Sequence, residues 1–222
     1  MIRILLSVTM LFYILPVIAE VHLAPEIGLQ SSGFSRLSVT SQNMQYKPSF
    51  GLKTGFWVDS IIDGNFTAQW GVFFFMKNAT YKGIQNNNAI KESVHLNYFE
   101  YHLNLGYRFI INERCYLFAN TGPFLRFGLW GKYESETMIN GVEQSYNTTN
   151  VFSRKDDALF KWFDYGWNIN TGCMFSSGIY LKMSYGLAFP NIAKSISSKA
   201  NNKSELGFAV GYNINRYRRH NY

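Results

Sequence analysis

Apolar and polar side chains alternate in successive stretches along most of this chain, each about ten residues long or longer. In the clearest stretch, residues 158–175, Phe163, Tyr165 and Trp167 alternate with small or polar residues. Side chains two positions apart lie on the same face of a β-strand, so such a stretch has one apolar and one polar face. A wall between lipid and a polar interior needs strands of this kind. The alternation therefore predicts a transmembrane β-barrel.

The N-terminus has the features of a secretory signal peptide. Arg3 supplies the charged start, residues 4–15 form an apolar core, and small residues precede an expected cleavage after Ala19. The alternative is an uncleaved anchor helix, but Pro16 interrupts the run and the run is short for a membrane span. No later segment approaches the roughly 20 apolar residues of a transmembrane helix, so a membrane-embedded chain must cross with strands in a closed barrel.

Eight alternating stretches follow the signal peptide, at residues 25–34, 49–59, 66–77, 94–109, 115–133, 158–175, 179–187 and 204–214. The connections after the second, fourth and sixth stretches are short and the others are long, as in outer-membrane barrels with periplasmic turns and extracellular loops. We predict an all-β fold, an eight-stranded antiparallel up-and-down transmembrane β-barrel over residues 20–215, with a basic C-terminal tail at 216–222. The long loops, chiefly 81–93 and 134–157, would carry any binding role.

The polar faces carry charges of both signs, which we assign to the barrel interior. They are Lys53, Asp59, Lys77, Glu100, His102, Arg108, Arg126, Asp164, Lys182 and Glu205. The interior of an eight-stranded barrel is just wide enough for side chains to fill it. We therefore expect these groups to pair across the lumen and plug it, rather than to line a conducting pore.

No pattern in the sequence predicts catalysis, a cofactor or a metal site. A lipid-modifying barrel enzyme would use a histidine near the extracellular rim, where His95 and Asp156 or Asp157 are the available residues. However, the chain has neither a Gly-x-Ser-x-Gly nor a His-Glu-x-x-His motif, and its four histidines are scattered. The histidines and the two cysteines also lack ligand spacing. We expect a protein that is not an enzyme, with the lipid-modifying enzyme as an alternative.

The two cysteines, Cys115 and Cys173, fall on strands that we predict to be neighbours, and both point outward at the periplasmic rim. Oxidation is possible in that compartment. Directly opposed strand positions, on the other hand, often have unfavourable disulfide geometry. The sequence leaves open whether they form a disulfide or remain two free thiols.

The chain is basic, with a formal net charge of +7 and a pI near 9.3, and the cluster at residues 216–220 accounts for much of the excess. A basic protein can bind nucleic acid, but the expected export argues against that partner. We expect the tail to be solvated and to contact lipid phosphates or acidic partners. Aromatic residues make up 18% of the chain, which suits strands with an apolar face and rings at a membrane interface.

Several strings occur in an order that resembles the PorT-like outer-membrane β-barrel domain family of Bacteroidota. They are LNYFEYHL at 96–103, LFANTGPF at 117–124, FDYGWN at 163–168 and YGL at 185–187 with Asn191-Ile192. The resemblance runs from about residue 28 to residue 214. It implies an eight-stranded outer-membrane barrel, and it implies no single activity, although the family's namesake is associated with type IX protein secretion.

Two positions depart from the pattern of that family. His102 stands where the family often has proline, and the chain ends in a basic tail at Tyr222, where the family usually ends its last strand in phenylalanine. The tail would weaken recognition of the last strand by the assembly machinery, unless Tyr222 serves as the terminal aromatic residue. Neither departure changes the predicted fold.

We expect a small, monomeric, non-enzymatic protein of the bacterial outer membrane, with loops for binding or envelope integrity. Its expected partners are outer-membrane lipid and other envelope or secretion proteins, not nucleic acid. An accessory role in type IX secretion is an alternative. A soluble lipocalin-like carrier is another. Phe73 and Phe75 break the alternation of the third stretch, so that stretch also fits a core strand of a soluble protein. In such a carrier the apolar face would point into the barrel.

Overall fold

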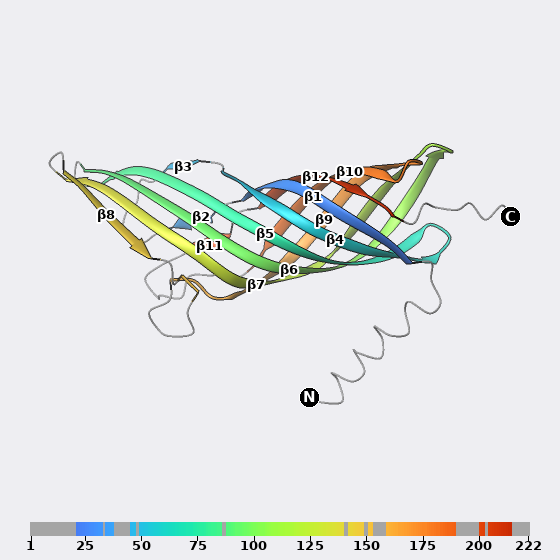
Figure 1. Cartoon of the computed structure of the whole chain (residues 1–222), viewed down its shortest axis with the longest axis horizontal. Coiled ribbons are helices and arrows are strands. Elements are labelled where there is room, and N and C mark those ends of the chain that lie inside the picture. The colour runs from blue at the N-terminus through green and yellow to red at the C-terminus, as the bar shows by residue number, and fades with distance from the viewer. Residues whose placement is uncertain are drawn as a thin grey trace, which may run out of the picture.

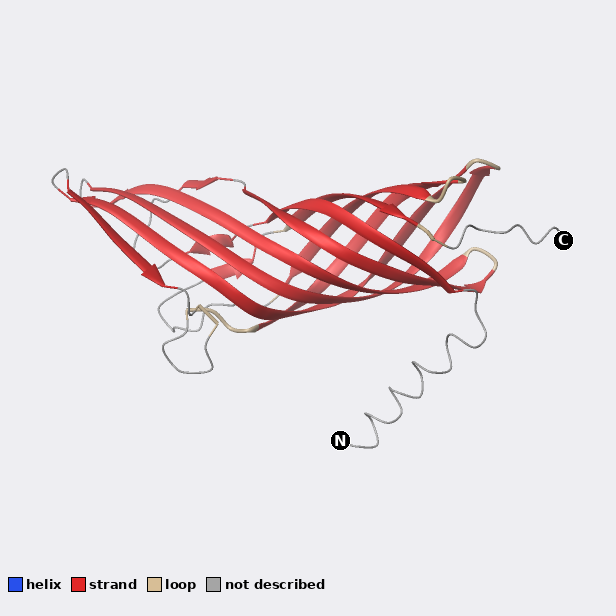
Figure 2. Cartoon of the chain, in the orientation of Figure 1, coloured by secondary structure: helices blue, strands red, loops and turns tan. Residues whose placement is uncertain are grey.

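The computed structural model describes residues 21–32, 34–37, 45–47, 49–85, 88–139, 142–148, 151–152, 159–189, 200–202 and 204–214. Nearly all of these residues lie in β-strands (Figure 2). The predicted signal peptide, residues 1–19, and the predicted tail, residues 216–222, lie outside the described residues. Within the described part of the chain, no helix is long and apolar enough to cross a membrane.

Eight antiparallel strands close into a barrel (Figure 1). They are β1 (Val21–Ser32), β4 (Ser49–Asp63), β5 (Phe66–Gln85), β6 (Asn88–Asn112), β7 (Cys115–Ile139), β9 (Phe163–Phe175), β10 (Ile179–Ala188) and β12 (Glu205–Tyr212). Each strand pairs with the next one of this series, and β12 pairs with β1. The predicted eight-stranded up-and-down barrel is confirmed. Because the ring has no free edge, its backbone groups are satisfied within the wall.

Four short strands add to the barrel. β3 (Gln45–Lys47) pairs with β5, and β8 (Val142–Thr148) pairs with β7. β2 (Phe34–Leu37) and β11 (Ala200–Asn202) form a separate two-stranded sheet. All four lie in the connections that were predicted to be long loops.

Two of the predicted loops are mainly β-structure, so that part of the prediction is wrong. β5 and β6 remain paired as far as Gln85 and Asn88, and β7 continues to Ile139, where β8 turns back along it. Figure 1 shows these strands running past the rest of the barrel at one end. A polar sequence does not prevent strand pairing when a neighbouring strand supplies the hydrogen bonds. The side chains of Ile90 and Val94 are also buried on the inner face of these strands, which gives the extension an apolar contact. We call residues 78–85, 88–95, 132–139 and 142–148 the projecting sheet.

The opposite end of the barrel is closed by three short turns, which follow β4, β6 and β9. Gly64 and Gly178 have positive φ angles of 50° and 92°, a conformation that glycine adopts without strain. The start of β1 and the end of β12 lie at this end too, because Asn213 N donates a hydrogen bond of 2.8 Å to Gly178 O in the turn after β9, and Ile214 N donates one of 2.9 Å to Leu23 O. Short turns and chain termini mark the periplasmic side of outer-membrane barrels.

The outer wall is apolar and the interior is polar. On β5, the outward Ala68, Trp70 and Val72 continue the alternation, while Phe73 and Phe75 point inward and are only 1% and 0% exposed. The outward side chains of β6 are apolar or aromatic from Phe109 to Phe99. If the strand is tilted by about 40° from the membrane normal, this stretch spans a membrane thickness of about 25 Å. In a soluble carrier the arrangement would be reversed, with the apolar face of each strand inside the barrel and the polar face outside.

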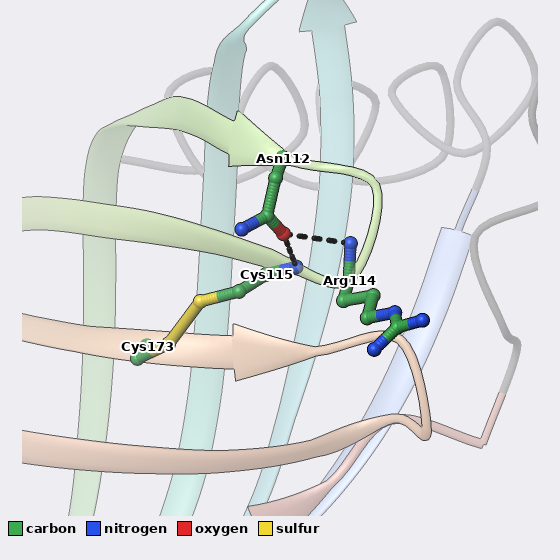
Figure 3. Close-up of a disulfide and its surroundings, with 4 residues drawn as sticks. All are labelled: Asn112, Arg114, Cys115 and Cys173. Carbon is green, nitrogen blue, oxygen red and sulfur yellow. Dashed lines mark hydrogen bonds between the residues drawn. A yellow bond between two sulfur atoms is a disulfide. The ribbon is translucent and has the colours of Figure 1, made fainter.

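Cys115 and Cys173 form a disulfide between β7 and β9 (Figure 3). In the ladder Cys115 pairs with Phe175 and Cys173 pairs with Leu117, so the cysteines are diagonal neighbours with Cα atoms 6.7 Å apart. The diagonal position avoids the direct opposition that made a disulfide doubtful from the sequence. Beside it, Asn112 Oδ1 accepts hydrogen bonds from the backbone N–H groups of Arg114 and Cys115, at 2.8 and 3.0 Å, which stabilise the turn after β6.

The disulfide joins residues 58 positions apart. Closing a chain loop of that length restricts the unfolded state, and the expected stabilisation is about 2–4 kcal/mol. We predict that replacing both Cys115 and Cys173 by serine lowers the free energy of unfolding in detergent by this amount, measured by urea titration. Reducing agent should destabilise the native protein to the same extent and leave the double variant unchanged. Equal stability of all samples would contradict the prediction.

Candidate functional site

The barrel interior holds a cluster of charges around Arg126 on β7. Its guanidinium donates to Glu100 through Nε and to both carboxylate oxygens of Glu205, at 2.9 and 2.5 Å. Asp164 Oδ2 lies 3.6 Å from Nη1, and Lys77 donates to Glu205 at 3.1 Å. All five side chains are at most 1% exposed. The cluster thereby connects β5, β6, β7, β9 and β12 across the lumen.

Aromatic rings enclose the same guanidinium. The Arg126 Cζ atom lies 4.7 Å from the centroid of the Phe75 ring and 4.2 Å from that of Phe124. Both rings are almost fully buried. Cations are attracted to the faces of aromatic rings, and this attraction is stronger where water is excluded. The rings fill the space around the charge, so the lumen is blocked by packing as well as by ion pairing.

Lys53 and His102 extend the cluster through Glu100. Lys53 and the His102 Nε2 atom both contact Glu100 Oε1. On the other side of the ring, His102 Nδ1 lies 3.1 Å from the Asn168 amide nitrogen, which is a donor only. Lys53 Nζ also lies 3.0 Å from His102 Nε2, so both ring nitrogens have polar neighbours. The imidazole is held in one orientation inside the wall.

A second cluster surrounds Glu26 on β1, a residue that the sequence reasoning missed. The Glu26 carboxylate accepts hydrogen bonds from Trp57 Nε1 at 3.0 Å, from the Tyr180 hydroxyl at 2.9 Å and from Lys182 at 2.5 Å. Glu26 is 5% exposed and lies two residues before Gly28, on the same inward face of the strand. This spacing could have predicted its position from the sequence, but the first stretch has the weakest alternation of apolar and polar residues.

The remaining interior candidates, Asp59 and Arg108, lie near the turn end of the barrel. Both side chains are buried, and Asp59 lies beside Arg108 and Gln69. A cavity of about 30 Å³ separates them from Lys182, which is room for about two water molecules. Every interior candidate from the sequence is therefore within the barrel, but the structure divides them between an Arg126 cluster, a Glu26 cluster and the turn end.

The described inner wall carries charges of both signs in nearly equal numbers. Across these three groups, the basic side chains are Lys53, Lys77, Arg108, Arg126 and Lys182, and the acidic ones are Glu26, Asp59, Glu100, Asp164 and Glu205. The inward-facing Glu92 on β6 is also fully buried, which makes five cations against six anions. Charges of both signs in contact with one another neutralise each other locally, so the interior does not have the ring of one sign that selects ions in a channel.

An apolar cluster closes the barrel above the charges, at the end that carries the projecting sheet. Phe75, Tyr98 and Tyr133 pack there against the short segments 151–152 and 159–160. Gly131 makes this possible, because a Cβ atom at that position would lie 2.5 Å from a Val151 methyl group. β9 begins at Phe163, later than the start of the predicted stretch, and the described Leu159 and Phe160 before it pack into this cluster.

The candidates for catalysis are not brought together in the described part of the chain. His95 Nδ1 lies 3.0 Å from Asn78 Oδ1 on the outer face, and Asp156 and Asp157 lie outside the described residues. Among the residues with described positions, no group of three or more His, Cys, Asp and Glu side chains could hold a metal ion. The geometry therefore offers a filled, hydrogen-bonded interior as its main polar site.

This fold defines a transmembrane β-barrel, with paired charges and aromatic rings packed in the described interior. The model of the outer membrane protein β-barrel domain family matches residues 18–194, which is most of the 222-residue chain. The chain belongs to this family, and it is a protein of the bacterial outer membrane.

Several solved structures are similar to this chain. Neisserial surface protein A is 10% identical, with 88% of this chain and 99% of that chain covered and a TM-score of 0.43. Ail, the attachment invasion locus protein of Yersinia pestis, is 12% identical, with 88% and 99% covered and a TM-score of 0.34. OprG from Pseudomonas aeruginosa is 10% identical, with 88% and 96% covered and a TM-score of 0.45. No curated protein matches the chain.

Removing the guanidinium should be costly, because it would leave several carboxylates buried without their counter-ion. We predict that Arg126→Met lowers the free energy of unfolding by about 3–5 kcal/mol, measured by urea titration in detergent. The control is Lys91→Met, which breaks the exposed 3.0 Å pair with Glu136 and should cost less than about 1 kcal/mol. Similar losses in the two variants would show that the buried cluster does not hold the barrel together.

Proposed function

We propose that this protein is a non-enzymatic surface barrel, in which the wall anchors the chain and the projecting sheet binds a partner or maintains the envelope. One observation carries the proposal: the lumen is filled by paired charges and rings, whereas β5, β6 and β7 continue well beyond the apolar wall. A barrel without a passage has its accessible chemistry at its ends. The longer end is therefore the place to look for function.

The projecting sheet has the size and surface of a binding element. On β6 it runs from His95 to Asn88, which is a length of about 20 Å at the rise of a β-strand. This segment begins beyond the aromatic rows of the wall. Its outer face is polar and carries the exposed pair Lys91 and Glu136. By the rule that short turns face the periplasm, this sheet lies outside the cell.

We propose further that this chain is related to the PorT-like barrels of Bacteroidota, and the strings behind that resemblance occupy informative places. They supply Glu100, Asp164 and Asn168, all of which are buried in the interior. Likeness in interior residues supports a shared barrel architecture more directly than a shared task. An accessory role in type IX secretion is therefore the second candidate, and the experiment below separates it from the first.

The test compares the full chain with a shortened chain in a deletion strain. In the shortened chain an Asn-Gly turn replaces residues 83–90, and another replaces residues 137–144. The new turns join Lys82 to Lys91 and Glu136 to Ser145, residues that are already paired. Type I′ turns of this sequence suit two-residue hairpins. Heat-modifiable mobility on a gel shows whether the shortened barrel still folds.

We expect the full chain, and not the folded shortened chain, to restore surface attachment and resistance to detergent in the deletion strain. Full rescue by the shortened chain would overturn the role of the projecting sheet. Loss of secreted proteins from the deletion strain, restored by both chains, would instead favour the secretion role.

The filled interior also predicts the electrical behaviour of the purified protein. In planar lipid bilayers we expect no stable single-channel conductance, because Arg126, Phe75 and Tyr98 block the lumen. The control is a triple variant with alanine at these three positions, which should conduct if it still shows heat-modifiable mobility. Steady conductance of the native protein would contradict a purely anchoring barrel.

A further inference from the structure

The outer face of β5, β6 and β7 changes abruptly from aromatic to polar along the strands. Phe74, Phe99 and Phe127 form one row across the three strands. Two rows further toward the projecting sheet, the register places Asn78, His95 and Lys132 side by side. Aromatic residues collect at the boundary of the hydrocarbon layer, so the second row lies at the level of the lipid headgroups.

Two tryptophans occupy the boundary between these rows. Trp130 is 58% exposed and lies 5.7 Å from the Phe74 ring, measured between centroids. Trp162 is 47% exposed and lies 5.7 Å from the Phe127 ring. Their indole rings are amphipathic and suit the interface, where one part of the ring is in hydrocarbon and the N–H is near water.

Cations outnumber anions on the described outer face beyond this boundary. The charged side chains that are at least partly exposed there are Lys82, Lys91, Lys132 and Lys161, against Glu134 and Glu136. Lys82, Lys91 and Glu136 lie two rows beyond Lys132. Four positive charges and two negative charges leave a net charge of +2. Lys161 directly precedes Trp162, and Lys132 is two residues beyond Trp130, so two of the four cations are next to the boundary tryptophans.

The partner of Lys132 does not prevent it from binding an anion. Lys132 forms an ion pair with Glu134, and the hydrogen bond from Lys132 lowers the pKa of the Glu134 carboxyl. An ammonium group has three donors, and the Lys132 side chain is 48% exposed. It can therefore donate to Glu134 and to a second anion at the same time. His95 lies directly opposite Lys132 in the ladder and adds a ring nitrogen at the same level.

We propose that Lys132 and Lys161 bind the phosphate of an anionic lipid headgroup, with Trp130 and Trp162 packed against the lipid below it. Phosphate groups lie just beyond the hydrocarbon layer, at the height of these lysines. The proposed site depends on the position of the barrel in the membrane and not on the partner-binding role proposed above. It would fix the depth of the barrel and orient the projecting sheet above the lipid surface.

The experiment uses the full chain in nanodiscs of phosphatidylcholine, with or without the diphosphorylated glycolipid lipid A. Native mass spectrometry of the released protein counts the lipid A molecules that it retains. The double variant Lys132→Gln with Lys161→Gln should retain lipid A about tenfold less than the native chain. Retention of phosphatidylcholine should be unchanged, and high salt should weaken lipid A retention by the native chain.

Three single variants sharpen the test, and Arg114→Gln is the matched control. Arg114→Gln removes one exposed positive charge at the turn end and should retain lipid A like the native chain, while Lys132→Gln should retain several-fold less. Glu134→Gln removes the competing carboxylate and should increase retention. Equal retention by the native chain, the double variant and Arg114→Gln would overturn the site. Heat-modifiable mobility of each variant ensures that only folded barrels are compared, so the result does not depend on the surface-attachment experiment.

Discussion

The bidentate contact between Arg126 and Glu205 is the interaction around which the interior is organised. It joins β7 to β12 across the lumen, and Glu100, Asp164 and Lys77 all contact this pair. A charge without counter-ions would be prohibitively costly in this position, so each member requires the others. The closed wall supplies the fixed geometry, because its backbone hydrogen bonds leave the facing side chains little freedom to separate.

This filled interior determines where the protein can meet other molecules. The described interior is packed at the level of Arg126, so the surfaces we consider for contacts are the apolar wall, the headgroup boundary near Trp130 and the projecting sheet. In our proposals, the wall anchors the chain in the membrane, the boundary sets its depth, and the sheet binds a partner outside the cell. A long, paired sheet is also more rigid than a free loop of the same length, and a rigid surface loses less conformational entropy on binding.

The strand pattern predicted much of the fold, and its failures have identifiable causes. Nine of the ten interior candidates from the sequence are buried and Lys53 is partly buried, because strand parity assigns a face to each residue. Glu26 was missed because its stretch alternates weakly. The projecting sheet was taken for loops because its outer face and the residues at its tip are mostly polar, which hides the pairing of long hairpins, such as Gln85 with Asn88. The disulfide was undecided because a shift of two residues in register separates a directly opposed pair from a diagonal one.

The sequence by itself determined that apolar and polar side chains alternate every second residue, how many strands form the barrel, and which face of each strand is apolar. These are local properties, since a side chain's face depends only on its position along its own strand. Only the tertiary structure decided which charges meet: Arg126 and Glu205 are 79 residues apart, and Glu26 and Lys182 are 156 apart. Such contacts depend on the register and closure of the whole ring, which no single strand specifies. For the same reason, the length of the projecting sheet became visible only when both of its strands were in place.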